Sequence, residues 1–337
     1  MLKAVIIGLG GVARTCHFPA YKYLEDKGKV KLVAGYDPYV KSLSGDVKFN
    51  LTIDTSNTIT DLKLYDSVEE MLETEKPDIV DICVPTPFHS DMACEMLEKG
   101  YHVFCEKPMA RTYEQAERMV NAANKAGKKL MIGQCVRFFP AYAYIKQAYE
   151  KGELGKPVTA MFRRISFPPT WGAGSWFMNY EKSGGCLLDM SLHDIDFAQY
   201  LYGAPEKVSC FKKDVRCACD SVLSTLVYPD FNVHIMGDWA MEGVPFLADF
   251  QLGFEKATCV MQNDVLTVYN ADGTSFVPEL DTVGGHTVEL ENFADWINGT
   301  RENKEIPPES TALSIKLAET LAKSAFDGGK LISFEGR

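Results

Sequence analysis

Residues 2–13 read LKAVIIGLGGVA, and this stretch decides how the N-terminal third of the chain folds. An apolar run of strand length leads directly into a glycine-rich turn and then into a candidate helix. The pattern G-x-G-x-x-A permits a tight turn and a close approach of the backbone to a pyrophosphate, which then lies at the helix N-terminus. We therefore expect a dinucleotide to be held by Gly8, Gly10, Gly11, Val12 and Ala13.

A second apolar run, VKLVAGYD at 30–37, reads as a strand that ends in an acidic residue, Asp37. A carboxylate at the end of the second strand is placed to bind the hydroxyl groups of a ribose. A 2′-phosphate would be repelled there, and no basic residue follows before Lys41. The pattern favours NAD over NADP.

Apolar runs and amphipathic segments alternate up to residue 135. We expect helices at 12–27, 67–75, 90–100 and 112–127, and further strands at 62–65, 78–85, 101–108 and 129–135. Near-continuous apolar strands joined by helices indicate a parallel sheet that is covered on both faces. The segment 41–61 is polar and carries no clear pattern.

Dinucleotides lie at the carboxyl ends of such strands, near the point where the strand order reverses. After the strand 78–85 we therefore expect cofactor contacts from Pro85, Thr86 and His89, although these residues would also suit a turn that only starts the next helix. After the strand 101–108 we expect them from Glu106 and Lys107. Two opposite charges at the end of a buried strand are costly unless they are paired or used.

The second half of the chain changes character. Strand-like runs cover 156–167, 207–217, 221–228, 231–241, 246–254, 256–261 and 264–269. Several alternate apolar and polar residues, as a half-covered antiparallel sheet does. We expect an α/β protein with a doubly wound parallel domain at 1–130 and an α+β domain with a large, mostly antiparallel sheet at 131–337.

The composition excludes some classes of partner. The chain has 46 acidic and 35 basic residues, a net charge of −11, which disfavours nucleic acid and anionic membranes as partners. No signal peptide or long apolar span is apparent, and the ten cysteines are scattered. We expect reduced thiols, a cytoplasmic location and no membrane partner.

The stretch GGCLLDMSLHDID at 184–196 places Asp189, His193 and Asp196 at spacings of four and three. On one helix the three would lie within an arc of about 60°. Such a stripe suits a metal site or acid–base chemistry, and also a structural network of hydrogen bonds. Two carboxylates and one imidazole from a single helix are an uncommon set for zinc or iron, so we expect no metal.

Three segments together resemble the glucose–fructose oxidoreductase/inositol dehydrogenase/MocA family. They are GLGGVARTCHFPAY at 8–21, HSDMACEMLEKGYHVFCEKPMA at 89–110, and the stretch 184–196. The resemblance spans essentially the whole chain. It implies a Rossmann domain, a C-terminal α/β domain whose open sheet mediates assembly into a homodimer or homotetramer, and oxidation or reduction of a sugar, sugar derivative or cyclitol with NAD or NADP.

The resemblance also implies roles for residues. Lys107, Asp189 and His193 stand where the family has its lysine, aspartate and histidine, and Gln134 and Arg137 lie in a segment that reaches cofactor or substrate. Oxidation of a secondary alcohol needs a base near pH 7, and a neutral histidine suits that role. We expect His193 and Lys107 to move the proton, with Asp189 orienting the imidazole.

Two further side chains are candidate substrate contacts. Asp196 follows His193 by three residues, and an ion pair or a helix cap is the alternative for it. Trp176 lies in an aromatic stretch at 167–180 and could stack on a sugar or belong to the core.

Two other functions stay open. One is a catalyst that retains its cofactor and oxidises, then reduces, the same substrate. The other is a non-catalytic dinucleotide-binding regulator, against which the intact Lys107, Asp189 and His193 argue. The sequence does not select among sugars and cyclitols, because loops decide that choice.

Overall fold

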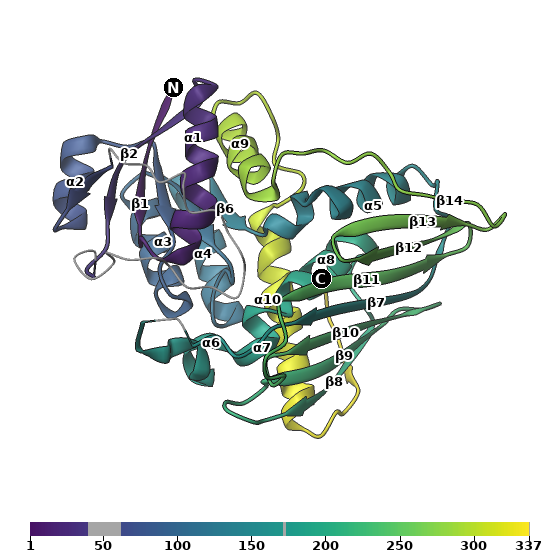
Figure 1. Ribbon diagram of the computed structural model, residues 1–337. Coiled ribbons are helices and arrows are strands. Elements are labelled where there is room, and N and C mark those ends of the chain that lie inside the picture. The colour runs from purple at the N-terminus through teal and green to yellow at the C-terminus, as the bar shows by residue number, and fades with distance from the viewer. Residues whose placement is uncertain (40–61, 171–172, 337) are drawn as a thin grey trace. The chain divides into compact units, whose positions relative to one another are not determined.

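The computed structural model describes residues 1–39, 62–170 and 173–336 (Figure 1). The segment 41–61, for which the sequence carried no clear pattern, lies outside these residues. The chain divides into two compact units. Unit 1 comprises Met1–Cys135 and Val283–Ala312, and unit 2 comprises Val136–Thr282 and Leu313–Arg337.

Unit 1 is built on a parallel sheet of order β3-β2-β1-β4-β5-β6. The strands are β1 (Leu2–Ile7), β2 (Val30–Tyr36), β3 (Lys63–Tyr65), β4 (Ile79–Ile82), β5 (His102–Glu106) and β6 (Leu130–Gly133). The order reverses at β1, so the turn after β1 lies at the topological switch point where dinucleotides bind. The expected doubly wound parallel sheet is confirmed.

Side-chain caps set the starts of two helices in unit 1. The helices are η1 (Ala13–His17), α1 (Phe18–Asp26), α2 (Val68–Glu75), η3 (Thr86–Phe88), α3 (His89–Glu98), α4 (Tyr113–Ala126) and α9 (Gly285–Ile297). Ser67 caps α2 by accepting the N–H of Glu70, and Thr112 forms a capping box at the start of α4. The segment expected to form one helix at 12–27 is helical without a break over 11–26, includes the five residues of the π-helix η1, and has Pro19 in the first turn of α1.

One segment of unit 1 comes from the C-terminal part of the chain. The helix α9 packs on α1, and its Glu291 and Asp295 pair with Lys29 at 2.9 and 2.8 Å. Phe293 of α9 also packs on Phe104 of β5, with ring centroids 5.8 Å apart. The structure therefore departs from the expected continuous second domain at 131–337, because 283–312 belongs to unit 1. Buried contacts, which local periodicity does not encode, decide this assignment.

Unit 2 contains a sheet of order β14-β13-β12-β11-β7-β10-β9-β8-β15. The strands are β7 (Pro157–Ile165), β8 (Lys207–Lys213), β9 (Ser221–Val227), β10 (Asn232–Asp238), β11 (Leu247–Phe254), β12 (Ala257–Gln262), β13 (Val265–Asn270), β14 (Ser275–Phe276) and β15 (Ile332–Ser333). Among the described pairs only β7 and β10 run parallel. The expected large, mostly antiparallel sheet is confirmed.

Helices cover one face of this sheet. They include α5 (Pro140–Glu150), α8 (Leu192–Tyr202) and α10 (Pro308–Phe326), while η4 (Cys135–Phe138), η5 (Ala173–Met178), α6 (Tyr180–Ser183) and α7 (Gly185–Asp189) are shorter (Figure 1). The core forms where Tyr142 of α5 meets Phe197 of α8 and Phe250 of β11, with ring centroids 4.8 and 5.1 Å apart. Alternate residues point to the other face, where Met161 is 49% exposed although its neighbours Ala160 and Phe162 are fully buried.

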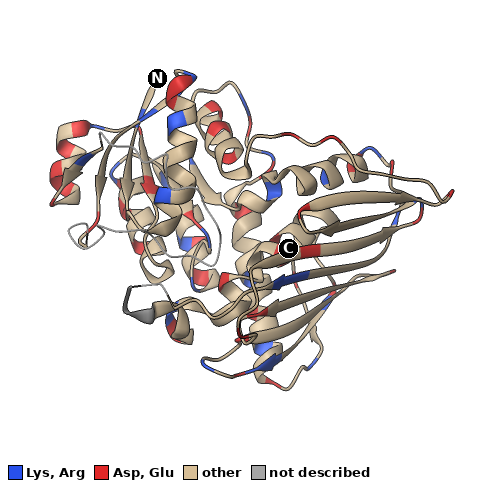
Figure 2. Cartoon of the chain, in the orientation of Figure 1, with Lys and Arg blue, Asp and Glu red and all other residues tan. Residues whose placement is uncertain are grey.

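Charge is distributed over both units. Figure 2 shows acidic and basic residues interspersed along the helices and strands, without a large region of positive charge. Within the described residues, no helix has both the length and the apolar character needed to cross a membrane. All ten cysteines are free thiols, as expected.

Candidate active site

The glycine-rich turn after β1 has the geometry that its sequence predicts. Gly8 adopts a φ of +95°, and a Cβ there would lie 2.6 Å from the carbonyl oxygen of Cys83, so glycine is required. A Cβ on Gly10 would instead meet nothing within 4 Å. The turn is therefore closed against β4 at Gly8 and open at Gly10. The open side, just ahead of the first helical turn at Ala13, is where an anion would approach the backbone N–H groups.

Asp37 lies directly after β2 and is held against this turn. Its Oδ2 accepts the backbone N–H of Leu9 at 2.8 Å, and its Oδ1 accepts the N–H of Tyr39 at 2.7 Å. A carboxylate oxygen has two lone pairs, so each oxygen keeps capacity for a further donor such as a ribose hydroxyl. Asp37 stands where the sequence predicted it, with its orientation fixed by two backbone groups.

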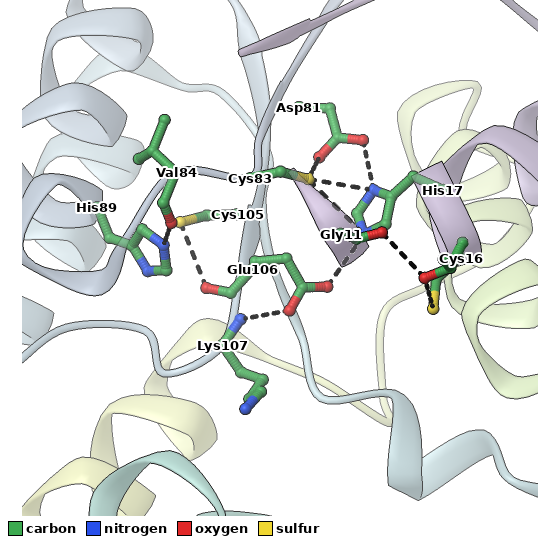
Figure 3. Close-up of polar contacts among 11 residues, drawn as sticks. Gly11, Cys16, His17, Asp81, Cys83, Val84, His89, Cys105, Glu106 and Lys107 are labelled. Carbon is green, nitrogen blue, oxygen red and sulfur yellow. Dashed lines mark hydrogen bonds and ion pairs between the residues drawn. The ribbon is translucent and has the colours of Figure 1, made fainter. Parts of the chain in front are cut away.

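The Glu106-Lys107-Pro108 turn follows β5, and the peptide between Lys107 and Pro108 is cis. Glu106 is buried and its Oε2 accepts the backbone N–H of Lys107 at 3.1 Å, whereas Lys107 is only half-buried (Figure 3). The carboxylate thus serves the backbone of this turn, while the lysine ammonium lies at the carboxyl end of the parallel sheet. Glu106 was expected to contact a cofactor; within unit 1 its two oxygens bind His17 and the Lys107 backbone.

The loop after β4 contains Pro85, Thr86 and His89. Pro85 precedes η3, the Thr86 side chain is buried, and the two ring nitrogens of His89 each lie 2.7 Å from a carbonyl oxygen, those of Val84 and Pro108. His89 therefore ties the loop after β4 to the turn after β5. No ring nitrogen is left for the polar cofactor contact that the sequence suggested, and the residue shapes the two loops instead.

Gln134 follows β6 at the same edge of the sheet. It is fully buried, and neither its amide oxygen nor its amide nitrogen has a hydrogen-bond partner among the described residues. A buried amide without partners is costly in a protein interior. These unpaired donor and acceptor atoms fit a residue that forms hydrogen bonds with a bound group.

Sequence reasoning missed a buried polar group behind this edge. His17, at the end of η1, lies 2.7 Å from Asp81 of β4 and 3.0 Å from Glu106, measured from its two ring nitrogens. The Sγ of Cys83 lies 3.5 Å from the ring. One signal was present in the sequence: Asp81 interrupts the apolar run IVDI, and a charge in a fully buried strand needs a partner.

The stretch 184–196 in unit 2 does not form the single helix that the sequence predicted. Asp189 ends α7, His193 is the second residue of α8, and Met190 and Ser191 lie between the two helices. The N–H groups of both intervening residues donate to the carbonyl of Cys186, at 3.1 and 2.8 Å. The three polar residues therefore lie on two helices and not on one, and Asp189 and His193 are both half-buried beside fully buried neighbours.

The first residue of α7, Gly185, has a packing role. Gly185 has a φ of +66°, and a Cβ there would lie 2.3 Å from the carbonyl oxygen of Ala218. The N–H of Cys186 donates to the carbonyl of Cys219 at 3.1 Å. Gly185 thus lets α7 start in direct contact with the loop before β9.

Arg137 and Asp196, both expected to bind substrate, bind each other. Arg137 Nε donates to Asp196 Oδ2 at 2.7 Å and Nη2 donates to Oδ1 at 2.6 Å, with both side chains buried. Ser314 Oγ donates to the same carboxylate at 2.7 Å, and the ring of Tyr200 lies 4.8 Å from the guanidinium. The ion pair that the sequence left as an alternative for Asp196 is the arrangement observed.

Trp176 belongs to an aromatic group in unit 2. Its ring stacks on Phe177 with centroids 4.0 Å apart, and Phe177 packs edge-on against Trp239 at 6.4 Å. Trp176 remains half-buried, so part of its side chain is accessible to solvent or to a ligand.

A parallel sheet of order 3-2-1-4-5-6 with a glycine-rich first turn and an acid after the second strand defines a dinucleotide-binding protein. Comparison with known proteins narrows the class. Residues 2–134 match the family described as "Oxidoreductase family, NAD-binding Rossmann fold", and residues 142–274 match the "GFO/IDH/MocA C-terminal domain". The chain belongs to this family of NAD-binding oxidoreductases.

Two curated relatives show the range of the similarity. The chain is 33% identical over 207 residues to the D-glucoside 3-dehydrogenase of Escherichia coli. The matched region is 60% of this chain and 55% of the relative. It is 27% identical over 315 residues to the scyllo-inositol 2-dehydrogenase (NAD(+)) of Bacillus subtilis. This match covers 88% of this chain and 86% of the relative. The match thus spans about half the length of the first relative and most of the second.

Solved structures show the same fold. The WlbA dehydrogenase of Bordetella pertussis, determined in complex with NADH and UDP-GlcNAcA, superimposes with a TM-score of 0.80. The two chains are 20% identical, and the match covers 99% of each. At this identity the likeness establishes the fold alone.

Proposed function

We propose that this protein is an NAD-dependent dehydrogenase that transfers a hydride between nicotinamide and a secondary alcohol or ketone of a sugar, sugar derivative or cyclitol. The observation that carries the proposal is the Glu106-Lys107-Pro108 turn. It brings a half-buried lysine to the carboxyl end of the sheet whose first turn is shaped for a dinucleotide. The dehydrogenases of glucosides and inositols among the relatives support the substrate class.

The residues of unit 1 fit a dinucleotide. The open face of Gly10 with Gly11, Val12 and Ala13 would hold the pyrophosphate, and Asp37 would accept the ribose hydroxyls. Pro85, Thr86 and Gln134 would line the nicotinamide end of the dinucleotide site. The side-chain amide of Gln134, which has no partner among the described residues, could hydrogen-bond the cofactor there. When bound, the nicotinamide accepts or delivers the hydride.

Asp37 supports NAD as the cofactor rather than NADP. Its two oxygens face the backbone N–H groups of Leu9 and Tyr39, which hold the carboxylate beside the turn. The 2′-phosphate of NADP would be repelled by this carboxylate. The choice is testable by comparing KM for the two cofactors.

In the proposed mechanism the substrate hydroxyl loses its proton to His193 while Lys107 donates a hydrogen bond to the same oxygen. The ammonium of Lys107 stabilises negative charge as it develops on that oxygen. Asp189 orients the imidazole of His193 and stabilises its protonated form. The buried pair of Arg137 and Asp196 joins η4 to α8, and in this role it fixes the helix that carries His193.

Two features of unit 2 support contacts with substrate and with a second copy. The half-exposed face of Trp176 would stack on an apolar sugar face. The uncovered face of the nine-stranded sheet exposes apolar side chains, and burial of this face between copies would form the homodimer or homotetramer. These side chains are Met161, Phe211, Leu223, Val265 and Tyr269.

The test is to follow NADH absorbance with NAD and a panel of sugars, sugar acids and inositols. On an active substrate, Lys107→Ala and His193→Ala should each lower kcat by about 10²–10⁴-fold. Lys22→Ala, a change in an exposed ion pair of α1, is the control. Near-wild-type turnover in either variant would refute the assignment. Tightly bound cofactor without net NADH formation on any substrate would favour a catalyst that retains its cofactor.

A further inference from the structure

A network of three buried titratable side chains connects η1, which follows the glycine-rich turn, to the turn that carries Lys107. His17 ends η1, Asp81 lies in β4 and Glu106 ends β5. Nδ1 of His17 lies 2.7 Å from Asp81 Oδ2, and Nε2 lies 3.0 Å from Glu106 Oε1 (Figure 3). The exposed fractions of the three residues are 0%, 0% and 6%, so water does not screen these contacts.

An imidazole between two carboxylates donates from both nitrogens only when it is protonated. Burial opposes that charge, but Asp81 and Cys83 outweigh it and hold the pKa of His17 well above its usual value. Burial would raise the pKa of Glu106, yet the hydrogen bond and charge of His17 lower it below its usual value. The central ring thus faces a carboxylate oxygen at each of its two nitrogens.

The far end of this chain reaches the backbone of Lys107. The second oxygen of Glu106 accepts the Lys107 N–H at 3.1 Å, so the orientation of one carboxylate fixes that peptide. Gly133 of β6 leaves the room for it, since a Cβ there would lie 2.7 Å from Glu106 Oε1. On the other side, His89 lies 2.7 Å from the carbonyl of Pro108. The turn is therefore held at both of its ends by buried histidines.

The same side chains could be considered as metal ligands, because atoms of His17, Asp81 and Cys83 lie within 4.8 Å of one another. Ligand atoms around tetrahedral zinc lie about 3.3–3.7 Å apart. The 2.7 Å between His17 and Asp81 is instead a charge-assisted hydrogen bond, and the other ring nitrogen is directed at Glu106. The geometry is that of a hydrogen-bonded network.

We propose that His17 is a positioning residue, which holds Glu106 and through it sets the place of Lys107 at the substrate. This inference rests on the proposed role of Lys107 in proton transfer. Its physical basis is that displacement of a reacting group by about 1 Å can lower a rate by about 10²-fold. Loss of the contact with Glu106 should therefore act on kcat, while loss of the contact with Asp81 should act mainly on stability.

Substitution of His17 by Gln or by Asn keeps one of its two contacts and removes the other. In His17→Gln the amide nitrogen reaches the position of Nε2 and keeps the contact with Glu106. In His17→Asn the amide nitrogen takes the position of Nδ1 and keeps the contact with Asp81. We expect His17→Gln to retain at least tenfold more kcat than His17→Asn, with similar KM for NAD in both. Each variant replaces the ring by a neutral amide and loses one buried hydrogen bond, so the melting temperature should fall in both variants, whereas kcat should fall mainly in His17→Asn.

The outcomes distinguish this inference from the proposed function. If Lys107→Ala keeps its turnover, the proposed function fails. If Lys107→Ala is inactive but the two His17 variants have equal kcat, His17 does not position Lys107. Stoichiometric zinc in the purified wild-type protein, lost from both His17 variants, would also overturn the inference.

Where the His17 variants do not fold, Glu106→Gln and Asp81→Asn provide the same comparison from the two carboxylates. The amide of Gln at position 106 can accept only one of the two N–H groups that Glu106 binds. Glu106→Gln should lose at least tenfold more kcat than Asp81→Asn. An equal or greater loss in Asp81→Asn would contradict the inference.

Discussion

The buried pair of Arg137 and Asp196 allows a direct test of whether these residues stabilise unit 2 or contact substrate. In Asp196→Asn, the carboxylate becomes a neutral amide of nearly the same shape. The two Arg137 donors, at 2.7 and 2.6 Å, and the Ser314 hydroxyl, at 2.7 Å, then lose their charged acceptor. We expect the variant to be markedly less stable than the wild type.

The magnitude follows from burial, because neither partner is more than 1% exposed. Removal of one charge from a buried pair costs about 3–5 kcal/mol, since the other charge stays in the interior without its partner. The amide oxygen of Asn keeps one acceptor, and Tyr200 keeps its ring over the guanidinium. We therefore expect a loss of about 3 kcal/mol, at the lower end of this range.

The measurement is the free energy of unfolding in urea, followed by tryptophan fluorescence. A Trp296→Phe background leaves tryptophans only in the sequence of unit 2, so the signal reports on that unit. The matched control is Asp327→Asn, which also lies in unit 2. Asp327 forms an exposed ion pair with Lys330, in which both side chains are more than 60% accessible, and its loss should cost less than about 0.5 kcal/mol.

A loss below about 1 kcal/mol in Asp196→Asn, close to that of the control, would refute a structural role for the pair. A raised KM for the sugar substrate at an unchanged free energy of unfolding would instead support a direct contact between Asp196 and the substrate, as the sequence suggested. A double variant, Arg137→Met with Asp196→Leu, adds a second check. It should be more stable than the sum of the two single losses predicts, because no charge remains unpaired.

Three further predictions follow from local geometry. Gly8→Ala should lower the free energy of unfolding by about 1–2 kcal/mol or more. Gly10→Ala should keep the wild-type melting temperature but weaken NAD binding, measured by calorimetry. Equal stability of the two variants would contradict the turn geometry. Burial, with Lys128 and Lys129, lowers the pKa of His102 to about 4. The folded state then binds this proton more weakly than the unfolded chain, so stability should fall as pH drops from 6.5 toward 4, by about 1–2 kcal/mol after solvent screening; urea unfolding of His102→Asn should lack this decline. Phe211→Lys with Leu223→Lys, at facing positions of β8 and β9, should shift the chain toward monomers in light scattering, and an unchanged mass would rule out this part of the face as the interface.

Much of unit 1 could be read from the sequence because its signals are local. Apolar runs joined by amphipathic helices predicted the parallel sheet, and the positions of Gly8 and Asp37 relative to β1 and β2 predicted the dinucleotide-binding turn. The helices expected at 67–75 and 112–127 begin within one residue of those positions, where Ser67 and Thr112 cap α2 and α4. Each of these signals acts within a few residues of the structure that it sets.

The roles of the polar residues in unit 2 could not be read in the same way. A regular helix was assumed from Asp189 to Asp196, and on that assumption the three polar residues shared one face. The structure breaks the helix at Met190 and Ser191, where two N–H groups share the carbonyl of Cys186. Asp196 then lies in the interior against Arg137, which is 59 residues earlier in the chain.

By itself the sequence determined the periodicity of the elements, the turns that need glycine, and the residues able to carry the chemistry. Only the tertiary structure decided which buried charges meet: His17 with Asp81, 64 residues away, and with Glu106, 89 residues away. It also placed α9 in unit 1. The physical reason is that a buried charge must find a partner in space, and the choice among distant partners is made by the packing of the strands and helices that carry them.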